Sequence, residues 1–241
     1  MKKIALVTGA SSGIGAASVI SLLEAGFEVH GAARRFEQIP AGAIAHHLDV
    51  TDPESILELS HRFPKLDLLV ANAGGAFDAT TVMDADLDSW SKTFEINVLG
   101  TIRTIKAFKA SLLNSSSAHI ILMGSTAGRV TYEMGGSYIA AKHAIAAIAG
   151  TLRLELNEIP IRVSEIAPGM VKTDEFALNR FAGDSAKAAK VYEGVAKPLT
   201  ADDIGKIVAW TASQPDHVNL DLVVVRPVAQ AAQHKVHRIT K

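Results

Sequence analysis

The sequence contains no cysteine among its 241 residues. It therefore forms no disulfide and offers no thiolate as a nucleophile or metal ligand, which fits a reducing compartment and leads us to expect a cytoplasmic protein. Neither sign of charge is in surplus, since 24 Lys and Arg residues face 25 Asp and Glu residues and the formal net charge is -1. A chain with this balance has no electrostatic reason to bind nucleic acid or an anionic membrane.

Long apolar runs are also missing. The first run, Ile4 to Val7, ends at Thr8-Gly9 and is too short for the apolar segment of a signal peptide, and no later run reaches the length of a membrane span. The nine histidines show no metal-ligand spacing, because His46 and His47 are adjacent and point to opposite faces of a strand. We expect neither a membrane segment nor a metal site.

Short apolar runs alternate with helical patterns along the whole chain. The first run lacks polar alternation, which is typical of a parallel strand covered on both faces. Strands are predicted at 4–7, 27–33, 43–48, 67–71, 119–123, 161–166 and 220–225. Helices are predicted after residue 15, from residue 54, and over 87–113, 137–157 and 201–213. This alternation predicts an α/β fold in one domain over residues 1–241, a Rossmann-type doubly wound seven-stranded parallel sheet with helices on both faces.

A glycine-rich segment joins the first strand to the first helix. Glycines allow a backbone to approach a ligand closely, and the amino end of the helix presents unpaired N–H groups to a pyrophosphate. The alternative is a tight turn with no ligand, but the place of the segment in the first strand-helix-strand unit favours a dinucleotide. The expected cofactor contacts here are Gly9, Ser11, Ser12, Gly13, Ile14 and Gly15.

The second predicted strand ends in two arginines, Arg34 and Arg35. An NAD-binding chain usually has an acidic residue at this position, which accepts from the ribose 2′-hydroxyl. Two guanidinium groups instead match a 2′-phosphate, so the sequence favours NADP(H) as the cofactor. The alternative is a solvated pair of surface arginines.

The next two strands end in further polar residues on the expected cofactor side. Asp49, followed by Val50, could accept from the adenine amino group, and Asn72-Ala73-Gly74 could line the adenosine side. Each has a structural alternative. Asp49 could cap the following helix, although Asp52 is better placed to do so, and Asn72 could brace the buried backbone.

Tyr138 and Lys142 lie four positions apart on a predicted helix, so they share one face. A free tyrosine has a pKa near about 10, and a neighbouring positive charge favours its phenolate form. Ser125, thirteen positions before Tyr138, could hydrogen-bond the oxygen of a reacting carbinol or carbonyl. Asn97 is an amide inside an apolar helical stretch, where it needs partners and could hold a water that links Lys142 to solvent.

The sequence resembles the short-chain dehydrogenase/reductase family over nearly its whole length. The motifs that carry the resemblance, in the family's order and spacing, are Thr8-Gly9-x-x-x-Gly13-x-Gly15, Asp49, Asn72-Ala73-Gly74, Asn97, Ser125, Tyr138-x-x-x-Lys142 and Pro168-Gly169-x-Val171-x-Thr173. One departure is Ala71, where many members have a second asparagine.

The resemblance implies an enzyme that moves a hydride between a nicotinamide and a carbon beside Tyr138. It implies that Tyr138 is the general acid/base, that Lys142 lowers the tyrosine pKa and holds the nicotinamide ribose, and that Ser125 binds the reacting oxygen. Asn97 is implied in the proton relay. The residues implied at the nicotinamide end are Pro168, Gly169, Val171 and Thr173.

Further stretches, among them Gly124-Ser125-Thr126-Ala127-Gly128 and Pro215-Asp216-His217-Val218-Asn219, resemble the NADP-dependent 3-hydroxy acid (serine / L-allo-threonine) dehydrogenase branch. The resemblance implies a small hydroxy acid, or its carbonyl counterpart, as substrate. The alternatives are a reductase of a bulkier ketone or aldehyde and a non-enzymatic NADP-binding regulator.

The substrate loop is expected at about residues 170–198. A hydroxy acid needs a cation for its carboxylate, and Arg180 is the candidate. The alternative is that Arg180 pairs with Glu175 or Asp184, or touches cofactor phosphate.

Two further expectations concern partners. The predicted helices at 97–113 and 138–157 carry wide apolar faces, with Ile139, Ile145, Ile148 and Leu152 among the residues. Members of the family pair through these helices, so we expect a homotetramer or homodimer. The basic tail at 233–238 is expected to be solvated or docked on a partner.

Overall fold

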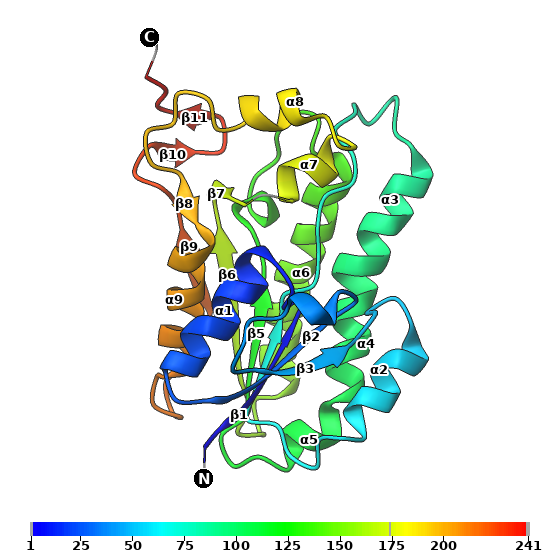
Figure 1. Cartoon of the computed structure of the whole chain (residues 1–241), viewed down its shortest axis with the longest axis vertical. Coiled ribbons are helices and arrows are strands. Elements are labelled where there is room, and N and C mark those ends of the chain that lie inside the picture. Colours follow the sequence, from blue (N-terminus) through cyan, green and yellow to red (C-terminus); the bar gives the residue numbers. More distant parts are fainter. Residues whose placement is uncertain (1, 174, 240–241) are drawn as a thin grey trace.

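Strand β1 (Ile4–Thr8) lies in the interior of a seven-stranded sheet in which every pair of neighbours is parallel (Figure 1). The computed structural model describes residues 2–173 and 175–239. The other strands are β2 (Glu28–Ala33), β3 (Ile44–His47), β4 (Leu68–Ala71), β5 (His119–Met123), β6 (Arg162–Pro168) and β9 (Leu222–Val225). Their order is β3-β2-β1-β4-β5-β6-β9, so the winding reverses between β1 and β4. The predicted fold class is confirmed.

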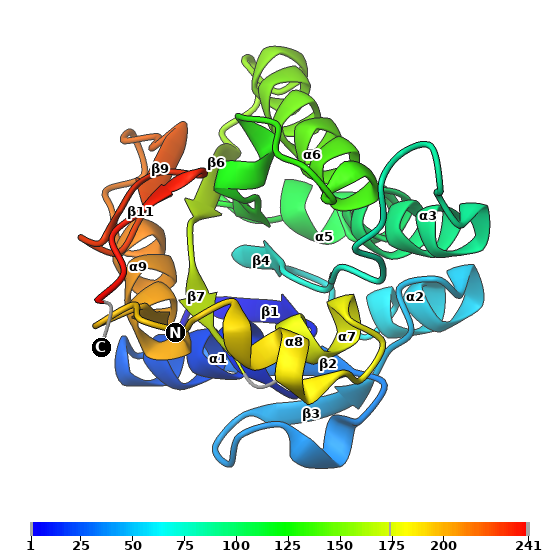
Figure 2. The same ribbon diagram turned by 90° about the horizontal axis from the view of Figure 1, so that it is seen from above.

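Helices cover both faces of this sheet (Figure 2). On one face α1 (Gly13–Glu24) and α9 (Ala201–Ala212) pack on alternate residues of the central strands, such as Val7 and Val70. On the other face α2 (Pro53–Ser60) and α6 (Gly136–Glu155) pack on Leu6 and Leu69, together with the buried Phe108. Because both faces are covered, the strands contain continuous apolar runs rather than alternating ones.

The long helix predicted over 87–113 is present but interrupted. It consists of α3 (Leu87–Phe94), a π-helical turn (Glu95–Leu99), α4 (Gly100–Ala107) and, after a break at Phe108, α5 (Lys109–Leu113). Asn97 lies in the π turn and donates to the carbonyl of Thr93 at 2.8 Å. A side chain that competes for backbone carbonyls explains the local widening, and such π turns often occur at functional sites.

The carboxy-terminal third contains short elements that periodicity does not predict. Around the substrate loop these are β7 (Val171–Lys172), α7 (Phe176–Arg180), α8 (Ser185–Lys190) and β8 (Leu199–Thr200). Near the carboxy terminus β10 (Gln230–Ala232) and β11 (Lys235–Val236) form a hairpin. The basic side chains of this tail, His234, Lys235, His237 and Arg238, are exposed, and Arg238 donates to the carbonyl of Val191 at 3.0 Å, which attaches the tail to its own chain.

The four isoleucine and leucine residues named on the predicted helices all pack within the single chain. Ile139 and Ile145 are buried in the core of the single chain, and Ile148 and Leu152 pack against it. The large apolar side chains that the described parts of these helices leave exposed are Leu99, Ile102, Leu113 and Leu154.

None of the helices in the described ranges combines the length and the apolar character needed to cross a bilayer. His46 and His47 do point to opposite sides of β3: His46 stacks on His30, whereas His47 lies edge-on to Phe36.

Candidate active site

The carboxyl ends of the strands open into a cavity of about 780 Å³ at the point where the winding reverses. This is the place where open α/β sheets bind their ligands. Of the residues singled out from the sequence, the following line the cavity: Gly9, Ser11, Ser12, Gly13, Ile14, Gly15, Arg34, Arg35, Asp49, Val50, Asn72, Ala73, Gly74, Ser125, Tyr138, Lys142, Pro168, Gly169, Val171, Thr173 and Arg180. Asn97 is not among the lining residues, although its neighbour Ile96 is.

The glycine loop has the shape that a pyrophosphate requires. Gly9 and Gly13 have φ angles of +67° and +51°, and a Cβ at Gly15 would lie 2.0 Å from the Gly9 carbonyl oxygen. Ser12 precedes α1 without capping it through its side chain, so the first N–H groups of the helix are available at the cavity. The loop therefore fits an anionic dinucleotide backbone.

A brace of hydrogen bonds fixes this loop to the neighbouring strand. The Asn72 amide donates to the Thr8 carbonyl at 2.9 Å, and the Thr8 hydroxyl accepts from the backbone N–H groups of Asn72 and Ala73 at 3.0 Å. The brace considered from the sequence for Asn72 is therefore present, while Ala73 and Gly74 form the cavity wall beside it.

At the adenosine end, Arg35 donates to the Glu175 carboxylate at 2.7 Å, and the Ser12 hydroxyl donates to the same oxygen at 3.1 Å. The hydrogen bond from Arg35 lowers the pKa of Glu175. Glu175 follows β7 in the substrate loop, so it joins that loop to the glycine loop. No local pattern indicates this contact, because Ser12 and Glu175 are 163 positions apart.

Asp49 closes its own turn by accepting from the Thr51 backbone N–H at 2.9 Å and from the Thr51 hydroxyl at 2.8 Å. Although burial acts to raise it, these bonds and the charge of Arg34 lower the pKa of Asp49. Helix α2 is capped instead by Asp52, which accepts from Glu54. The Asp49 carboxylate thus stays ionised at the cavity wall.

Helix α6 places Tyr138 and Lys142 on the face that meets the ends of β5 and β6. The Lys142 ammonium lies 5.6 Å from the centroid of the Tyr138 ring and donates to the Met123 carbonyl at 2.8 Å. Ser125 follows β5 and its hydroxyl accepts from the Ala127 backbone N–H at 3.1 Å. A hydroxyl, a phenol and an ammonium group therefore converge on one part of the cavity.

Burial acts on both ionisable groups of this set. It raises the pKa of Tyr138, and the Ser125 hydroxyl and the charge of Arg180 oppose that shift. It lowers the pKa of Lys142 to about 8, while the negative charge of Glu165 opposes the change. At neutral pH Tyr138 is therefore a phenol, the form that donates a proton.

Glu165 is a buried carboxylate that the sequence analysis did not single out. It lies on β6, pairs with Arg129, and occupies space that a Cβ at Gly124 would fill. Its Oε1 atom has no hydrogen-bond partner within the described part of the chain. A glutamate in the middle of a predicted parallel strand was the available signal, because such a strand is covered on both faces.

Asn97 is only 1% exposed and its amide is engaged with the backbone. It donates to the carbonyls of Gly75 and Thr93, each at 2.8 Å, and accepts from the Gly75 N–H at 3.2 Å. Its hydrogen bonds thus hold the segment after β4 rather than reaching Lys142, and the relay role stays a prediction.

Arg180 reaches the cavity from α7. It donates to the Met134 carbonyl at 2.9 Å and its guanidinium lies 5.6 Å from the centroid of the Tyr132 ring. Neither of the ion pairs considered from the sequence forms, since Glu175 pairs with Arg35 and Asp184 with Lys187. The Arg180 Nε atom is buried without a partner among residues 2–173 and 175–239.

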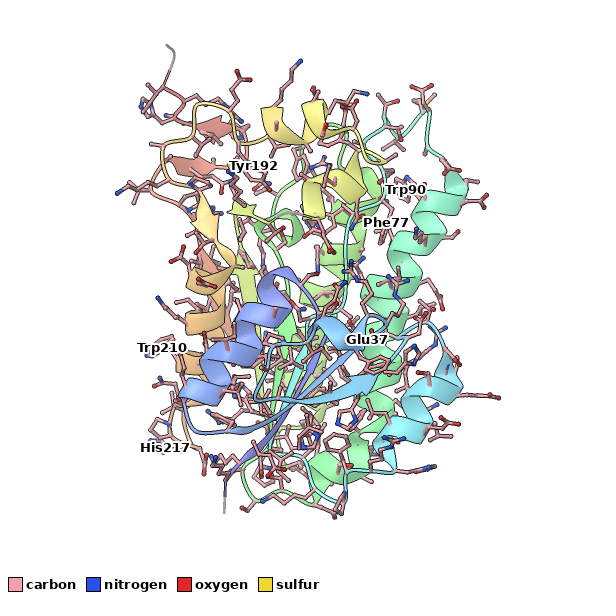
Figure 3. All side chains as sticks on the ribbon, viewed as in Figure 1. Glu37, Phe77, Trp90, Tyr192, Trp210 and His217 are labelled. Carbon is pink, nitrogen blue, oxygen red and sulfur yellow. The ribbon has the colours of Figure 1, made fainter. Side chains whose placement is uncertain are left out.

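Aromatic residues that the sequence analysis missed complete this end of the cavity. Phe176 lies edge-on to Tyr138 with the ring centroids 5.3 Å apart, and Phe77, Tyr132 and Tyr192 also line the space. Figure 3 shows Phe77 and Tyr192 in the upper half of the molecule, where α7 and α8 also lie. Only the fold, not local periodicity, brings these residues together.

Comparisons with known proteins agree with this geometry. The short chain dehydrogenase family matches residues 3–180. The chain belongs to this family. An uncharacterized oxidoreductase of Mycobacterium tuberculosis is 44% identical over 236 residues, which cover 96% of this chain and 93% of the relative.

The NADP-dependent 3-hydroxy acid dehydrogenase YdfG of Salmonella typhi is 35% identical over 247 residues, covering 98% and 99% of the two chains. A solved structure, the closed form of serine dehydrogenase complexed with NADP+, superimposes with a TM-score of 0.90 at 32% identity, covering 98% of this chain and all of the other. As a member of this family the protein is an oxidoreductase.

Proposed function

We propose that this short-chain dehydrogenase uses NADP(H) to interconvert a small hydroxy acid and its carbonyl counterpart. Arg180 carries the proposal, because it brings a positive charge into the same cavity as Tyr138 and has a buried nitrogen without a partner in the described chain. A carboxylate is the group that a guanidinium binds best. The relatives named as a 3-hydroxy acid dehydrogenase and a serine dehydrogenase support the same substrate class.

The cofactor part of the proposal rests on Arg34 and Arg35, which line the cavity after β2. Their planar donor groups suit a 2′-phosphate, and the N–H groups at the start of α1 suit the pyrophosphate. Asp49 and Val50 would contact the adenine side, and Pro168 to Thr173 the nicotinamide end. The named relatives are NADP-dependent or bind NADP+, which supports this choice.

The bound cofactor supplies or accepts the hydride, and the chain positions the other reactant. Ser125 would hold the reacting oxygen, and Tyr138 would donate or accept its proton. Lys142 would bring a positive charge beside the phenol and lower its pKa, which burial alone keeps high. Reduction needs the phenol as an acid, whereas oxidation needs its proton removed, so oxidation should accelerate as the pH rises.

The alternative is a reductase of a bulkier ketone or aldehyde, and the aromatic wall of Phe77, Tyr132 and Phe176 is the feature that favours it.

We also propose assembly into a homotetramer or homodimer, supported by the exposed apolar side chains of Leu99, Ile102 and Leu154.

The direct test is the nicotinamide absorbance change with NADP or NAD and a panel of L-serine, L-allo-threonine, 3-hydroxypropionate, 3-hydroxyisobutyrate and a simple secondary alcohol. Turnover of the acids with NADP supports the proposal. No absorbance change with any of the acids, together with reduction of a bulky neutral carbonyl by NADPH, favours the alternative.

Arg180→Ala sharpens this test. It should raise KM for 3-hydroxyisobutyrate by at least about tenfold, the effect of losing a hydrogen bond to a charged group, and change KM for its methyl ester by less than about twofold. Lys187→Ala is the matched control, since this exposed loop cation pairs with Asp184 outside the cavity. Equal effects of Arg180→Ala on acid and ester would contradict the assignment.

A further inference from the structure

The chain after β9 returns to the cavity instead of leaving the domain. Residues 226–239 include the β10 and β11 hairpin, which lies at the upper end of the molecule in Figure 1. His237 donates from its backbone N–H to the Ala229 carbonyl at 2.8 Å and closes this segment on itself. Two of its side chains, Gln230 and Gln233, line the same cavity as Ser125 and Tyr138.

Gln230 fixes the start of the segment against the turn after β6. Its side-chain oxygen accepts from the Met170 backbone N–H at 2.8 Å, and the residue is only 4% exposed. A Cβ at Gly169 would lie 2.3 Å from this oxygen. The missing side chain of Gly169 therefore makes room for Gln230, a role that is independent of any cofactor contact.

Gln233 is held in one orientation by its neighbours. Its side-chain oxygen accepts from the hydroxyl of Thr126 at 2.9 Å and faces the Gln230 amide at 3.5 Å. Thr126 is completely buried and follows Ser125 directly. The Thr126 hydroxyl and the Gln230 amide both point at the Gln233 side-chain oxygen. The two N–H groups of the Gln233 side chain therefore remain available as donors, and neither forms a hydrogen bond with residues in the described ranges.

The same segment also fastens the substrate loop that carries Arg180. Arg238 donates to the carbonyl of Val191 at 3.0 Å and to that of Glu193, and the Ile239 N–H donates to the Gly194 carbonyl at 2.8 Å. The loop and the tail, which contribute Arg180 and Gln233 to the lining of the same cavity, are thus joined to each other.

We infer that Gln233 is a substrate-specificity residue whose side-chain amide donates a hydrogen bond to the substrate carboxylate held by Arg180. This inference rests on the proposed function. A carboxylate has two oxygens and about four acceptor positions, so a guanidinium group leaves acceptors unpaired. A neutral amide donor fills one of them without adding charge and, through Thr126, ties the acid group to the strand end that presents Ser125.

The test measures KM for 3-hydroxyisobutyrate and for its methyl ester at saturating NADP. Gln233→Leu should raise KM for the acid about tenfold, because a donor to a charged group is lost. Gln233→Glu should raise it further, because two carboxylates then face each other. KM for the ester should change by less than about twofold in both variants.

The control is His234→Glu, which places the same negative charge on the adjacent, exposed residue of the tail and should change neither KM by more than about twofold. Ester turnover, NADPH dissociation constants and thermal unfolding midpoints show for each variant that the site is assembled.

An acid KM that stays within twofold of the wild type in both Gln233 variants overturns the inference while leaving the proposed function intact. An equal rise for acid and ester also overturns it, because it shows a structural role for the tail. A wild-type enzyme that prefers the ester contradicts the proposed function first and the inference with it.

Discussion

The two ends of the cavity are built in different ways. At the cofactor end, the wall of the cavity is formed largely by backbone atoms. Gly9, Gly13 and Gly15 shape the loop, and Thr8 and Asn72 brace it to β4. At the substrate end, side chains from α7, the tail and the segment before α6 meet through contacts such as that of Arg180 with Met134. The glycine loop is specified by consecutive residues, whereas the substrate end is formed by residues far apart in the sequence.

This difference makes the two ends unequal in their tolerance of substitution. A loop whose glycines lie against backbone atoms tolerates almost no substitution, since a side chain there collides with atoms that cannot move. A wall of side chains from separate segments can change one residue at a time. Tyr138 and Lys142 lie between the two ends, on the rigid helix α6.

The largest expected effect separates chemistry from binding. Tyr138→Phe removes only the phenolic oxygen, so kcat should fall about 10³-fold, the usual contribution of a general acid/base. The NADPH dissociation constant, measured by fluorescence titration, should stay within about threefold. Retention of most of the activity would remove Tyr138 from the chemical step, and a lost NADPH affinity would move it to the cofactor end.

A pair of glycine substitutions tests the contrast between the two ends. Gly15→Ala puts a Cβ against the Gly9 carbonyl and should cost about 3 kcal/mol of unfolding free energy and most of the NADPH affinity. Gly183→Ala, in the substrate loop, has open space around it and a φ of +89°, so it should cost only about 1 kcal/mol.

Denaturant unfolding and NADPH titration measure both variants. Similar losses in the two would mean that the cofactor end is no more constrained than the substrate loop.

The smallest effect is expected where the two ends touch. Glu175→Gln removes the carboxylate that holds Arg35. NADPH affinity should rise about threefold, because the guanidinium no longer has to leave the Glu175 carboxylate in order to bind the 2′-phosphate. NADH affinity should not change. Glu193→Gln makes the same charge change on an exposed residue of the same loop and serves as the control. Weaker NADPH binding in Glu175→Gln would show that Glu175 helps to hold the cofactor end in place.

The fold was predictable because its strands are short apolar runs with polar residues or glycines at their carboxyl ends. All seven predicted strands are present with bounds that differ by at most two residues, for example Arg162–Pro168 against the predicted 161–166. The interruption of the helix at Asn97 was not predicted, because a π turn leaves the apolar pattern almost unchanged.

The site was predictable only where its residues are neighbours in sequence or share one helix face. The glycine loop and the Tyr138/Lys142 pair belong to this group. The contact of Thr126 with Gln233 spans 107 positions, and that of Arg35 with Glu175 spans 140, so no local pattern predicts either contact. In addition, a glutamine or glutamate in a loop is ordinarily interpreted as a solvated surface residue.

A cation at each end of the cavity is the central claim, and initial rates with two cofactors and two substrates test it most directly. The account predicts that kcat/KM for 3-hydroxyisobutyrate with NADP exceeds both the value for its methyl ester with NADP and the value for the acid with NAD by at least about tenfold, since each comparison removes one anion from one cation. Rates that are equal for acid and ester, or for NADP and NAD, would contradict the claim at the corresponding end.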